Sequence, residues 1–244
     1  MLSKNEIKDI QSLRHKKFRE ETRLFVAEGP KIVGELLTVM PHHFKKLYGL
    51  EQWVNEHKKI VAEMDFEIIS ETELDRISQL QTPNQVVAVL HQFESNEPAA
   101  QNEMILYLDA IQDPGNFGSI IRIADWFGIK NIVCSEGCAD LYNIKVVQAT
   151  MASIARANIF YDKELEWLRK QEMPKYAAAL DGDSVYAVSK KNKGILIIGN
   201  ESKGIRSAIM EMIDQKITIP KTGKAESLNA AVATGIILSH LVKI

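Results

Sequence analysis

The chain has 244 residues, of which 45% are hydrophobic and 25% are charged. These proportions are typical of globular proteins and exclude a disordered chain, and the length suits one large domain or two modest ones. The formal net charge is only -2. A strong attraction of nucleic acid by the molecule as a whole is therefore excluded, and any site for a polyanion must be a local patch.

The first residues lead into a charged stretch, not an apolar core, which argues against a secretory signal peptide. No apolar run approaches the roughly 20 residues needed to cross a bilayer. The two cysteines, Cys134 and Cys138, lack a second pair of ligands, so we expect buried or half-buried thiols and no zinc. The histidines show no metal-like spacing either. We expect a soluble, cytoplasmic chain with no membrane partner and no metal.

The first 95 residues alternate between helical and strand patterns. A charged, amphipathic opening predicts a helix, and residues 25–28 predict a short strand. Gly29 and Pro30 then break the chain, with Pro30 well placed in the first turn of a helix that continues through Leu37. Further strands are expected at 46–50, 66–70 and 86–93. The pattern indicates a small α/β/α domain.

A polar stretch at residues 94–103 contains no large apolar side chain. Such composition is typical of a linker between domains. We therefore predict an N-terminal domain at 1–95, a linker at 96–103 and a C-terminal domain at 104–244.

Residues 104–111 form a nearly continuous apolar run, which is typical of a strand covered on both faces of a parallel sheet. Similar short runs recur at 131–134, 176–180, 195–198 and 217–219, and helical patterns separate most of them. This alternation predicts an α/β domain with a mainly parallel sheet. Because ligands bind beyond the carboxyl ends of such strands, the loops that follow these runs are expected to carry the chemistry.

The loop after 104–111 contains Asn116 and leads into a helix that ends near Gly128. Arg122 lies about 200° around that helix from Ile120, since a helix has about 3.6 residues per turn, so it points away from the buried face. Free amide groups at the helix start favour an anion nearby. Asn116 and Arg122 are therefore candidates to face an anion, although a structural turn with an exposed arginine gives the same pattern.

Two further loops follow buried runs. The first extends from Gly199 to Gly204 and is suited to holding a cofactor through backbone groups, although an ordinary capped turn has the same composition. The second extends from Pro220 to the last helix, where Ser227 and Asn229 either line a site or cap the helix. That helix is apolar nearly all round and rich in small residues, so it is buried on more than one side, and we expect a homodimer interface there.

Other nucleotide and hydrolase motifs are missing from the sequence. There is no G-x-G-x-x-G after a strand, no G-x-x-x-x-G-K-[ST] phosphate loop and no G-x-S-x-G around Ser227. A nicotinamide-dependent oxidoreductase and a serine hydrolase are therefore disfavoured.

Taken together and in this order, the three loops resemble the signature of the SpoU/TrmH family of RNA 2′-O-ribose methyltransferases, within the SPOUT superfamily. The resemblance covers residues 104 to the end, and the matching motifs are Asn116-x-Gly118-x-x-x-Arg122-x-Ala124, Gly199-Asn200-Glu201-x-x-Gly204 and Ile219-Pro220-x-x-Gly223-x-x-x-Ser227-Leu228-Asn229.

The resemblance implies a SPOUT α/β domain with a deep trefoil knot, which general topology rules would exclude. It also implies a homodimer with active sites at the subunit interface, and S-adenosyl-L-methionine as the cofactor. The implied catalytic and RNA-facing residues are Asn116, Arg122 and Glu201. The implied cofactor contacts are Leu180, Gly199, Ile219, Ser227, Leu228 and Asn229.

The N-terminal segment is similar to the L30e-like substrate-binding domain that precedes many family members. Between Lys4 and Arg23, seven Lys or Arg stand against four Asp or Glu. Such a local excess suits contacts with RNA phosphates, although a solvated helix face is the alternative. The candidate RNA contacts are Arg14, Lys16, Lys17 and Arg19.

The sequence departs from the family pattern at Gln148 and Ala152, where members carry arginine and glycine. The missing positive charge puts one RNA phosphate contact in question. The resemblance also implies a general-base role for Arg122, but an arginine pKa above about 12 opposes deprotonation. We therefore expect Arg122 to clamp an RNA phosphate and to stabilise the developing alkoxide, and we leave the base unassigned.

The function expected from the sequence is S-adenosylmethionine-dependent methylation of a ribose 2′-OH in RNA. The extra N-terminal domain favours ribosomal RNA over transfer RNA, and no residue indicates which nucleotide is modified. Three alternatives stay open: a non-catalytic methyltransferase-like RNA-binding protein, a base methyltransferase of another knotted family, and an oxidoreductase.

Overall fold

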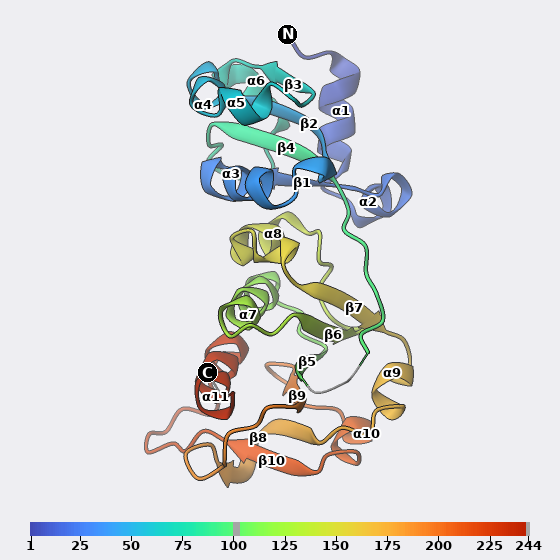
Figure 1. The fold of residues 1–244 in the computed structure, drawn as a ribbon, viewed down its shortest axis with the longest axis vertical. Coiled ribbons are helices and arrows are strands. Elements are labelled where there is room, and N and C mark those ends of the chain that lie inside the picture. The colour runs from blue at the N-terminus through green and yellow to red at the C-terminus, as the bar shows by residue number, and fades with distance from the viewer. Residues whose placement is uncertain (100–102, 243–244) are drawn as a thin grey trace. The chain divides into compact units, whose positions relative to one another are not determined.

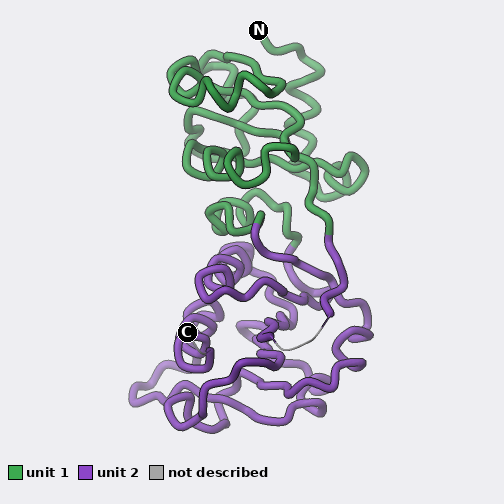
Figure 2. The backbone as a smooth tube through the Cα atoms, viewed as in Figure 1, with its two compact units in different colours: residues 1–94, 140–155 green, residues 95–139, 156–244 purple. Residues whose placement is uncertain are grey.

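The computed structural model describes residues 1–99 and 103–242, and the chain divides into two compact units (Figure 2). The first comprises Met1–Glu94 and Asp140–Ala155, and the second comprises Ser95–Ala139 and Arg156–Ile244. Part of the expected linker, residues 100–102, lies outside the described residues. The grouping of Asp140–Ala155 with the first unit was not anticipated. The division into domains at 1–95, 96–103 and 104–244 stays a prediction.

The first unit contains a mixed four-stranded sheet in the order β1-β4-β2-β3 (Figure 1). Strands β1 and β2 both pair antiparallel with β4, whereas β2 and β3 are parallel. The strands are β1 Leu24–Glu28, β2 Phe44–Gly49, β3 Phe66–Ile68 and β4 Val86–His91.

Helices cover this sheet. The α-helices are α1 Lys4–Ser12, α2 Lys16–Thr22, α3 Pro30–Val39, α4 Glu51–Glu56, α5 Lys58–Val61, α6 Glu71–Ile77 and α8 Ile144–Thr150, and short 3-10 helices occupy Pro41–His43 and Ser153–Ala155. Ile7 and Ile10 of α1 share a hydrophobic cluster with Ile77 of α6 and with Val87 and Val89 of β4. This burial is the main stabilising term of the unit, because removing apolar surface from water contributes about 25 cal/mol per Å².

The segment that carries α8 is joined to the rest of the first unit by buried polar contacts. Arg19 is only 4% exposed; its Nε and Nη2 donate to Asp140, and its Nη1 donates to the carbonyls of Leu13 and Arg14 at 2.7 and 2.8 Å. Gln148 Nε2 donates to the carbonyl of Glu28 at 2.8 Å. Gln148, where the family pattern has arginine, therefore binds backbone within this unit.

The second unit contains a six-stranded sheet in which every pair of neighbours is parallel, in the order β10-β8-β9-β5-β6-β7 (Figure 1). Its strands are β5 Met104–Asp109, β6 Asn131–Ser135, β7 Asn158–Asp162, β8 Lys175–Ser184, β9 Gly194–Gly199 and β10 Gln215–Thr218. The expected α/β class with a mainly parallel sheet is confirmed. Strand β7 was missed, and the implied knot stays a prediction.

Two groups of helices pack in the second unit: α7 Pro114–Trp126 and α11 Ala230–Leu241 in one, α9 Glu166–Arg169 and α10 Ser207–Met210 in the other. Trp167 and Ile209 of the second group share a cluster with Tyr107 and Ile197 of the sheet. Helices α7 and α11 are in contact, and Gly235 of α11 lies beside Ile123 of α7. Among the described residues, no helix has the length and apolar character that a bilayer crossing requires.

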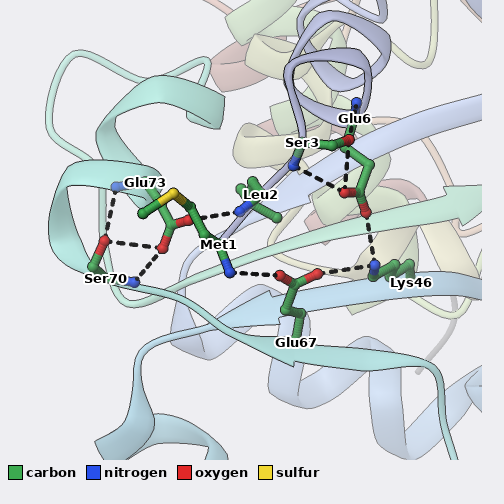
Figure 3. A network of polar contacts seen from close by, with 8 residues as sticks. All are labelled: Met1, Leu2, Ser3, Glu6, Lys46, Glu67, Ser70 and Glu73. Carbon is green, nitrogen blue, oxygen red and sulfur yellow. Dashed lines mark hydrogen bonds and ion pairs between the residues drawn. The ribbon is translucent and has the colours of Figure 1, made fainter.

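Capping residues stabilise the start of α6 in the first unit (Figure 3). Ser70 Oγ accepts a hydrogen bond from the amide of Glu73, whose carboxylate accepts from the amide of Ser70 and, at 2.7 Å, from that of Leu2. These reciprocal bonds satisfy donors that a helix start otherwise leaves free. They also join the beginning of the chain to α6.

A neighbouring network in Figure 3 centres on Lys46 of β2. Its Nζ binds Glu6 of α1 at 2.8 Å and Glu67 of β3 at 3.1 Å, and Glu67 also lies 3.6 Å from the amino group of Met1. The bond from Lys46 lowers the pKa of Glu6. One lysine thus bridges the first helix and the edge of the sheet.

The Glu73 carboxylate predicts a pH dependence of stability. Hydrogen bonds from Ser70 and Leu2 lower its pKa from 4.5 to about 2. A carboxylate with a depressed pKa stabilises the fold fully above its unfolded value, and this contribution is lost as the pH falls through the folded value. Glu73→Gln should therefore lower the Tm, measured by circular dichroism, at neutral pH. The difference in Tm between Glu73→Gln and the wild type should shrink as the pH falls from 4.5 towards 2.

Glu63→Gln is a matched control, because Glu63 is exposed in a turn of the same unit. Its Tm should follow the wild type over the same range. A Glu73→Gln difference that does not vary with pH would contradict the assignment.

Candidate active site

The expected site loops begin at one edge of the second sheet, because all its strands are parallel and therefore end on the same side. Strand β8 pairs with β9 only from Lys175 to Ala177, whereas β9 continues beside β5 as far as Gly199. Strands β8 and β9 thus separate from each other before either strand reaches its carboxyl end. Ligands of parallel α/β sheets bind at such an edge.

A chain of hydrogen bonds joins the three motif loops at this edge. Asn116, in the first turn of α7, donates from Nδ2 to Oε1 of Glu201 at 2.7 Å, and its Oδ1 accepts from Nδ2 of Asn229 at 2.6 Å. Glu201 and Asn229 lie 85 and 113 positions after Asn116 in the sequence. The structure therefore brings together three residues that the sequence analysis singled out.

The direction of this chain is fixed at its far end. Asn229 is the N-cap of α11, and its Oδ1 accepts hydrogen bonds from the amides of Ala231 and Val232 at 2.9 and 3.2 Å. Its amino group is therefore left to donate to Asn116, so the Asn116 amino group must in turn face the Glu201 carboxylate. The expected capping role of Asn229 and its place in the site are compatible.

Two residues outside the predicted set hold the loop after β9. Asp109, at the end of β5, is fully buried and accepts two hydrogen bonds from Arg206, from its amide at 2.8 Å and from its Nε at 2.7 Å; Nη2 of the same guanidinium completes the ion pair at 2.7 Å. Asn200 Nδ2 donates to the carbonyl of Ala110 at 2.7 Å, and its Oδ1 accepts from the amides of Ser202 and Lys203. The loop that carries Glu201 is thus tied to the end of β5.

A sequence signal for Asp109 did exist, because a carboxylate ends an otherwise apolar run of a strand buried on both faces. A buried charge requires a partner. No sequence pattern, however, indicates that the partner is Arg206.

The remaining predicted catalytic residue, Arg122, lies on α7 with an exposed side chain, as its angular position on the helix predicts. Ser227 is also exposed, in the loop before α11. Among the described residues of this chain, neither has a side-chain hydrogen bond or an ion pair. The structure thus does not place Arg122 or Ser227 in the hydrogen-bonded chain of Asn116, Glu201 and Asn229.

The predicted cofactor residues lie on β8, on β9 and in the loop after β10. Leu180 is 73% exposed, and its carbonyl accepts from Thr218 Oγ1 at 3.2 Å, so it lies beside the end of β10. Leu228, in the loop, is 47% exposed. Residues 219–228, which include Ile219, make no backbone–backbone hydrogen bond to the described part of the chain. Apart from the carbonyl of Ala225, which accepts from Lys221 Nζ at 3.2 Å, their backbone groups are therefore open to a ligand.

Two glycines on these strands have no room for a side chain. A Cβ at Gly199 would lie 2.5 Å from the carbonyl carbon of Gly204, and one at Gly182 would lie 2.6 Å from that of Lys216. Gly199 therefore allows the loop after β9 to fold back on itself. Gly182 allows β8 to approach β10 where the register of the two strands shifts. Gly182 was not anticipated.

The predicted RNA contacts fall into two groups. Arg14, Lys16 and Lys17 are exposed, and the two lysines lie 3.6 and 3.8 Å from Glu20 and Glu21 in the weak surface pairs typical of a helix. Arg19, by contrast, is buried in its contacts with Asp140 and two carbonyls. We therefore regard Arg19 as a structural residue and drop it from the proposed RNA contacts.

Both cysteines are free thiols, and Cys134 is buried while Cys138 is half-buried, as expected. Burial raises the pKa of Cys134, and a hydrogen bond with Cys134 lowers the pKa of Cys138. Within residues 1–99 and 103–242, no group of three or more histidine, cysteine or carboxylate side chains is arranged to hold a metal. The expectation of no metal stays a prediction.

Comparison with known proteins gives two family matches. The model of the SpoU rRNA Methylase family matches residues 103–239, and that of the MRM3-like substrate binding domain matches residues 4–88. Among curated proteins, the chain is 32% identical over 245 residues to the 23S rRNA (guanosine(2553)-2′-O)-methyltransferase RlmP of Bacillus subtilis, covering 96% of this chain and 95% of the relative.

Solved structures agree with this similarity. A TrmH-family protein from Porphyromonas gingivalis is 37% identical and superposes with a TM-score of 0.86, covering 99% of this chain and 98% of that one. An AdoMet-bound rRNA methyltransferase from Sinorhizobium meliloti is 30% identical with a TM-score of 0.86, covering 98% and 95%. With a family model that matches more than half of its residues, and with relatives similar along almost its whole length, the chain belongs to the SpoU rRNA methylase family.

Proposed function

We propose that this protein transfers a methyl group from S-adenosyl-L-methionine to the 2′-OH of a ribose in ribosomal RNA. The observation that carries the proposal is the hydrogen-bonded chain of Asn116, Glu201 and Asn229 at the edge where β8 and β9 part. It unites polar side chains from three loops whose motifs define the family. The AdoMet-bound relative and the 2′-O-methyltransferase relative support the cofactor and the reaction.

The residues at this edge fit the cofactor. Leu180 and Leu228 offer exposed apolar side chains that suit an adenine ring, and the open backbone groups of residues 219–228 suit its polar edge and the ribose. Gly199 and Ile219 contribute backbone at the ends of β9 and β10, and Ser227 contributes a hydroxyl. When bound, S-adenosylmethionine supplies an electrophilic methyl group on a sulfonium.

The protein then has to hold a ribose oxygen in line with that methyl group and stabilise the charge that develops on it. Alignment of reacting atoms at about 3–3.5 Å lowers the barrier substantially. Asn116, held by Asn229 and Glu201, is a rigid amide for orienting the ribose. The exposed Arg122 binds the neighbouring RNA phosphate and stabilises the developing alkoxide as a permanent cation.

We favour ribosomal over transfer RNA, because the curated relative that covers the whole chain acts on 23S rRNA and the first unit matches a substrate-binding domain. Arg14, Lys16 and Lys17 of that unit are the proposed RNA contacts, and with a net charge of -2 such contacts must be local. A ribosomal RNA substrate also accords with the cytoplasmic location that we propose.

A homodimer is the proposed assembly. Trp126, at the end of α7, is 84% exposed, and Val232, on α11, is 51% exposed. These two helices pack together in the same unit, and α11 is apolar on nearly all sides. Large exposed apolar side chains on adjoining elements are typical of protein interfaces.

The first experiment tests the function itself. The purified chain, with labelled S-adenosylmethionine and unmodified ribosomal RNA, should produce 2′-O-methylated ribose at a defined position. Arg122→Ala should abolish turnover while calorimetry shows unchanged cofactor binding, because the proposed role of this exposed side chain is to bind RNA. Methylation of a base would overturn the reaction assignment, and RNA binding without methyl transfer would favour the non-catalytic alternative.

The hydrogen-bonded chain predicts an unusual effect of a conservative substitution. Asn116→Asp keeps the shape and accepts from Asn229, but an ionised carboxylate cannot donate to Glu201 and repels it. We expect kcat at saturating cofactor to fall about 100-fold for both Asn116→Ala and Asn116→Asp, which corresponds to about 2.7 kcal/mol in the barrier. Asn55→Ala, an exposed amide on α4, is the control. Near-normal turnover of Asn116→Asp would exclude the proposed orienting role.

The proposed interface predicts a change of assembly. A charge in place of an exposed apolar side chain destabilises an interface that buries it. Val232→Asp and Trp126→Glu should each shift the mass measured by light scattering from dimer towards monomer. A wild type that elutes with the mass of one chain at all concentrations would refute the dimer.

A further inference from the structure

The first unit contains an open cavity, lined by both polar and apolar atoms, that includes none of the residues of the candidate active site. It has a volume of about 390 Å³, and the residues around it are Arg14, Gln79, Leu80, Gln81, Asn143, Ile144 and Lys145. Two of these side chains are cationic, three are amides and none is a carboxylate. The cavity therefore favours an anion that also presents hydrogen-bonding groups.

Buried contacts fix one wall of this cavity. Glu28 is only 1% exposed, and its carboxylate accepts from the hydroxyl of Ser78 at 2.5 Å and from the amide of Gln79 at 2.6 Å. Arg14 donates from Nη2 to the carbonyl of Ser78. Burial raises the pKa of Glu28. The positive charge of Arg14 opposes this shift, so the guanidinium stabilises the ionised carboxylate of Glu28.

The opposite wall is equally constrained. Asn143 is the N-cap of α8, and its Oδ1 accepts from the amide of Lys145 at 2.9 Å, while Ile144 packs against the hydrophobic cluster of the unit. Arg19 joins both walls, because it binds the carbonyl of Arg14 and the carboxylate of Asp140. The cavity is thus built before any ligand arrives, which lowers the cost of binding.

We propose that this cavity binds one unpaired nucleotide of the RNA substrate, with its phosphate between Arg14 and Lys145 and its base against the amides of Gln79, Gln81 and Asn143. The inference rests on the proposed function for the identity of the RNA. A volume of about 390 Å³ lies near the lower end of ligand pockets, about 300–1,000 Å³, and suits a single nucleotide.

The composition of the walls supports a nucleotide over a bare phosphate. Amide side chains both donate and accept, as the edges of bases require, and single-stranded RNA exposes those edges. Leu80 and Ile144 supply apolar surface for the flat face of a base. Lys145 also supplies a cation in the segment where Gln148 replaces the arginine of the family pattern.

The test measures the affinity of the full chain, without cofactor, for a short fluorescein-labelled single-stranded RNA of mixed sequence by fluorescence anisotropy. Lys145→Ala should weaken binding about tenfold, as expected for one charge-assisted contact, while Lys145→Arg should retain it. The slope of log Kd against log salt should fall by about 0.7 for Lys145→Ala, since each phosphate contact on a single strand releases about that many counterions.

Lys59→Ala is the matched control, because Lys59 is an exposed lysine on α5 and does not line the cavity. Arg14→Ala should weaken binding similarly, and its Tm reports whether loss of the Ser78 contact disturbs the fold. In the described part of the chain the Lys145 side chain makes no hydrogen bond or ion pair, so Lys145→Ala stays informative even if Arg14→Ala is unstable. Gln81→Ala should reduce differences in affinity among homopolymer RNAs.

Methyl-transfer kinetics separate this inference from the proposed function. Lys145→Ala should raise KM for RNA and leave kcat and calorimetric cofactor binding unchanged. Unchanged RNA affinity and salt slope in Lys145→Ala would overturn the nucleotide site and leave the methyltransferase assignment intact. A wild type that binds RNA through Lys145 but transfers no methyl group would overturn the function and leave the site.

Discussion

The candidate active site depends on the two roles of one amide side chain. Asn229 uses its oxygen to cap α11 and is left with only its amino group to offer Asn116. That constraint orients Asn116 towards Glu201 and connects the start of the last helix to the loops after β5 and β9. The need to satisfy the amides at a helix start therefore sets the direction of the hydrogen bonds in the proposed catalytic arrangement.

Buried charge holds this arrangement against the sheet. Asp109 has no contact with solvent, and Arg206 neutralises it through an ion pair and two hydrogen bonds that also fix the loop after β9. Loss of Arg206 would leave the buried Asp109 carboxylate without an opposite charge and would destabilise the fold. Because β8 leaves β9 beside this rigid pair, the parting of the strands forms a stable edge for a cofactor. Preorganised groups of this kind need little rearrangement during reaction.

In the proposed function, the first unit binds RNA in a chain whose net charge is only -2. Some of its basic residues stabilise the fold, and others are proposed to contact RNA. Arg19 is buried and joins the segment that carries α8, whereas Arg14 and Lys145 stay exposed around one cavity. Charge that is locally concentrated in this way attracts phosphate without requiring a basic molecule.

The sequence by itself determined the elements and the motifs. Apolar runs located β5, β6, β8, β9 and β10, Gly29 and Pro30 marked the start of α3, and three loop motifs identified the family, because these signals are local along the chain. The tertiary structure alone decided which loop residues meet, that Arg19 is buried, and that Asp140–Ala155 groups with the first unit. It also revealed β7, whose mixed burial gives no clear period. These features depend on contacts between residues as many as 121 positions apart, and no local pattern encodes such a pairing.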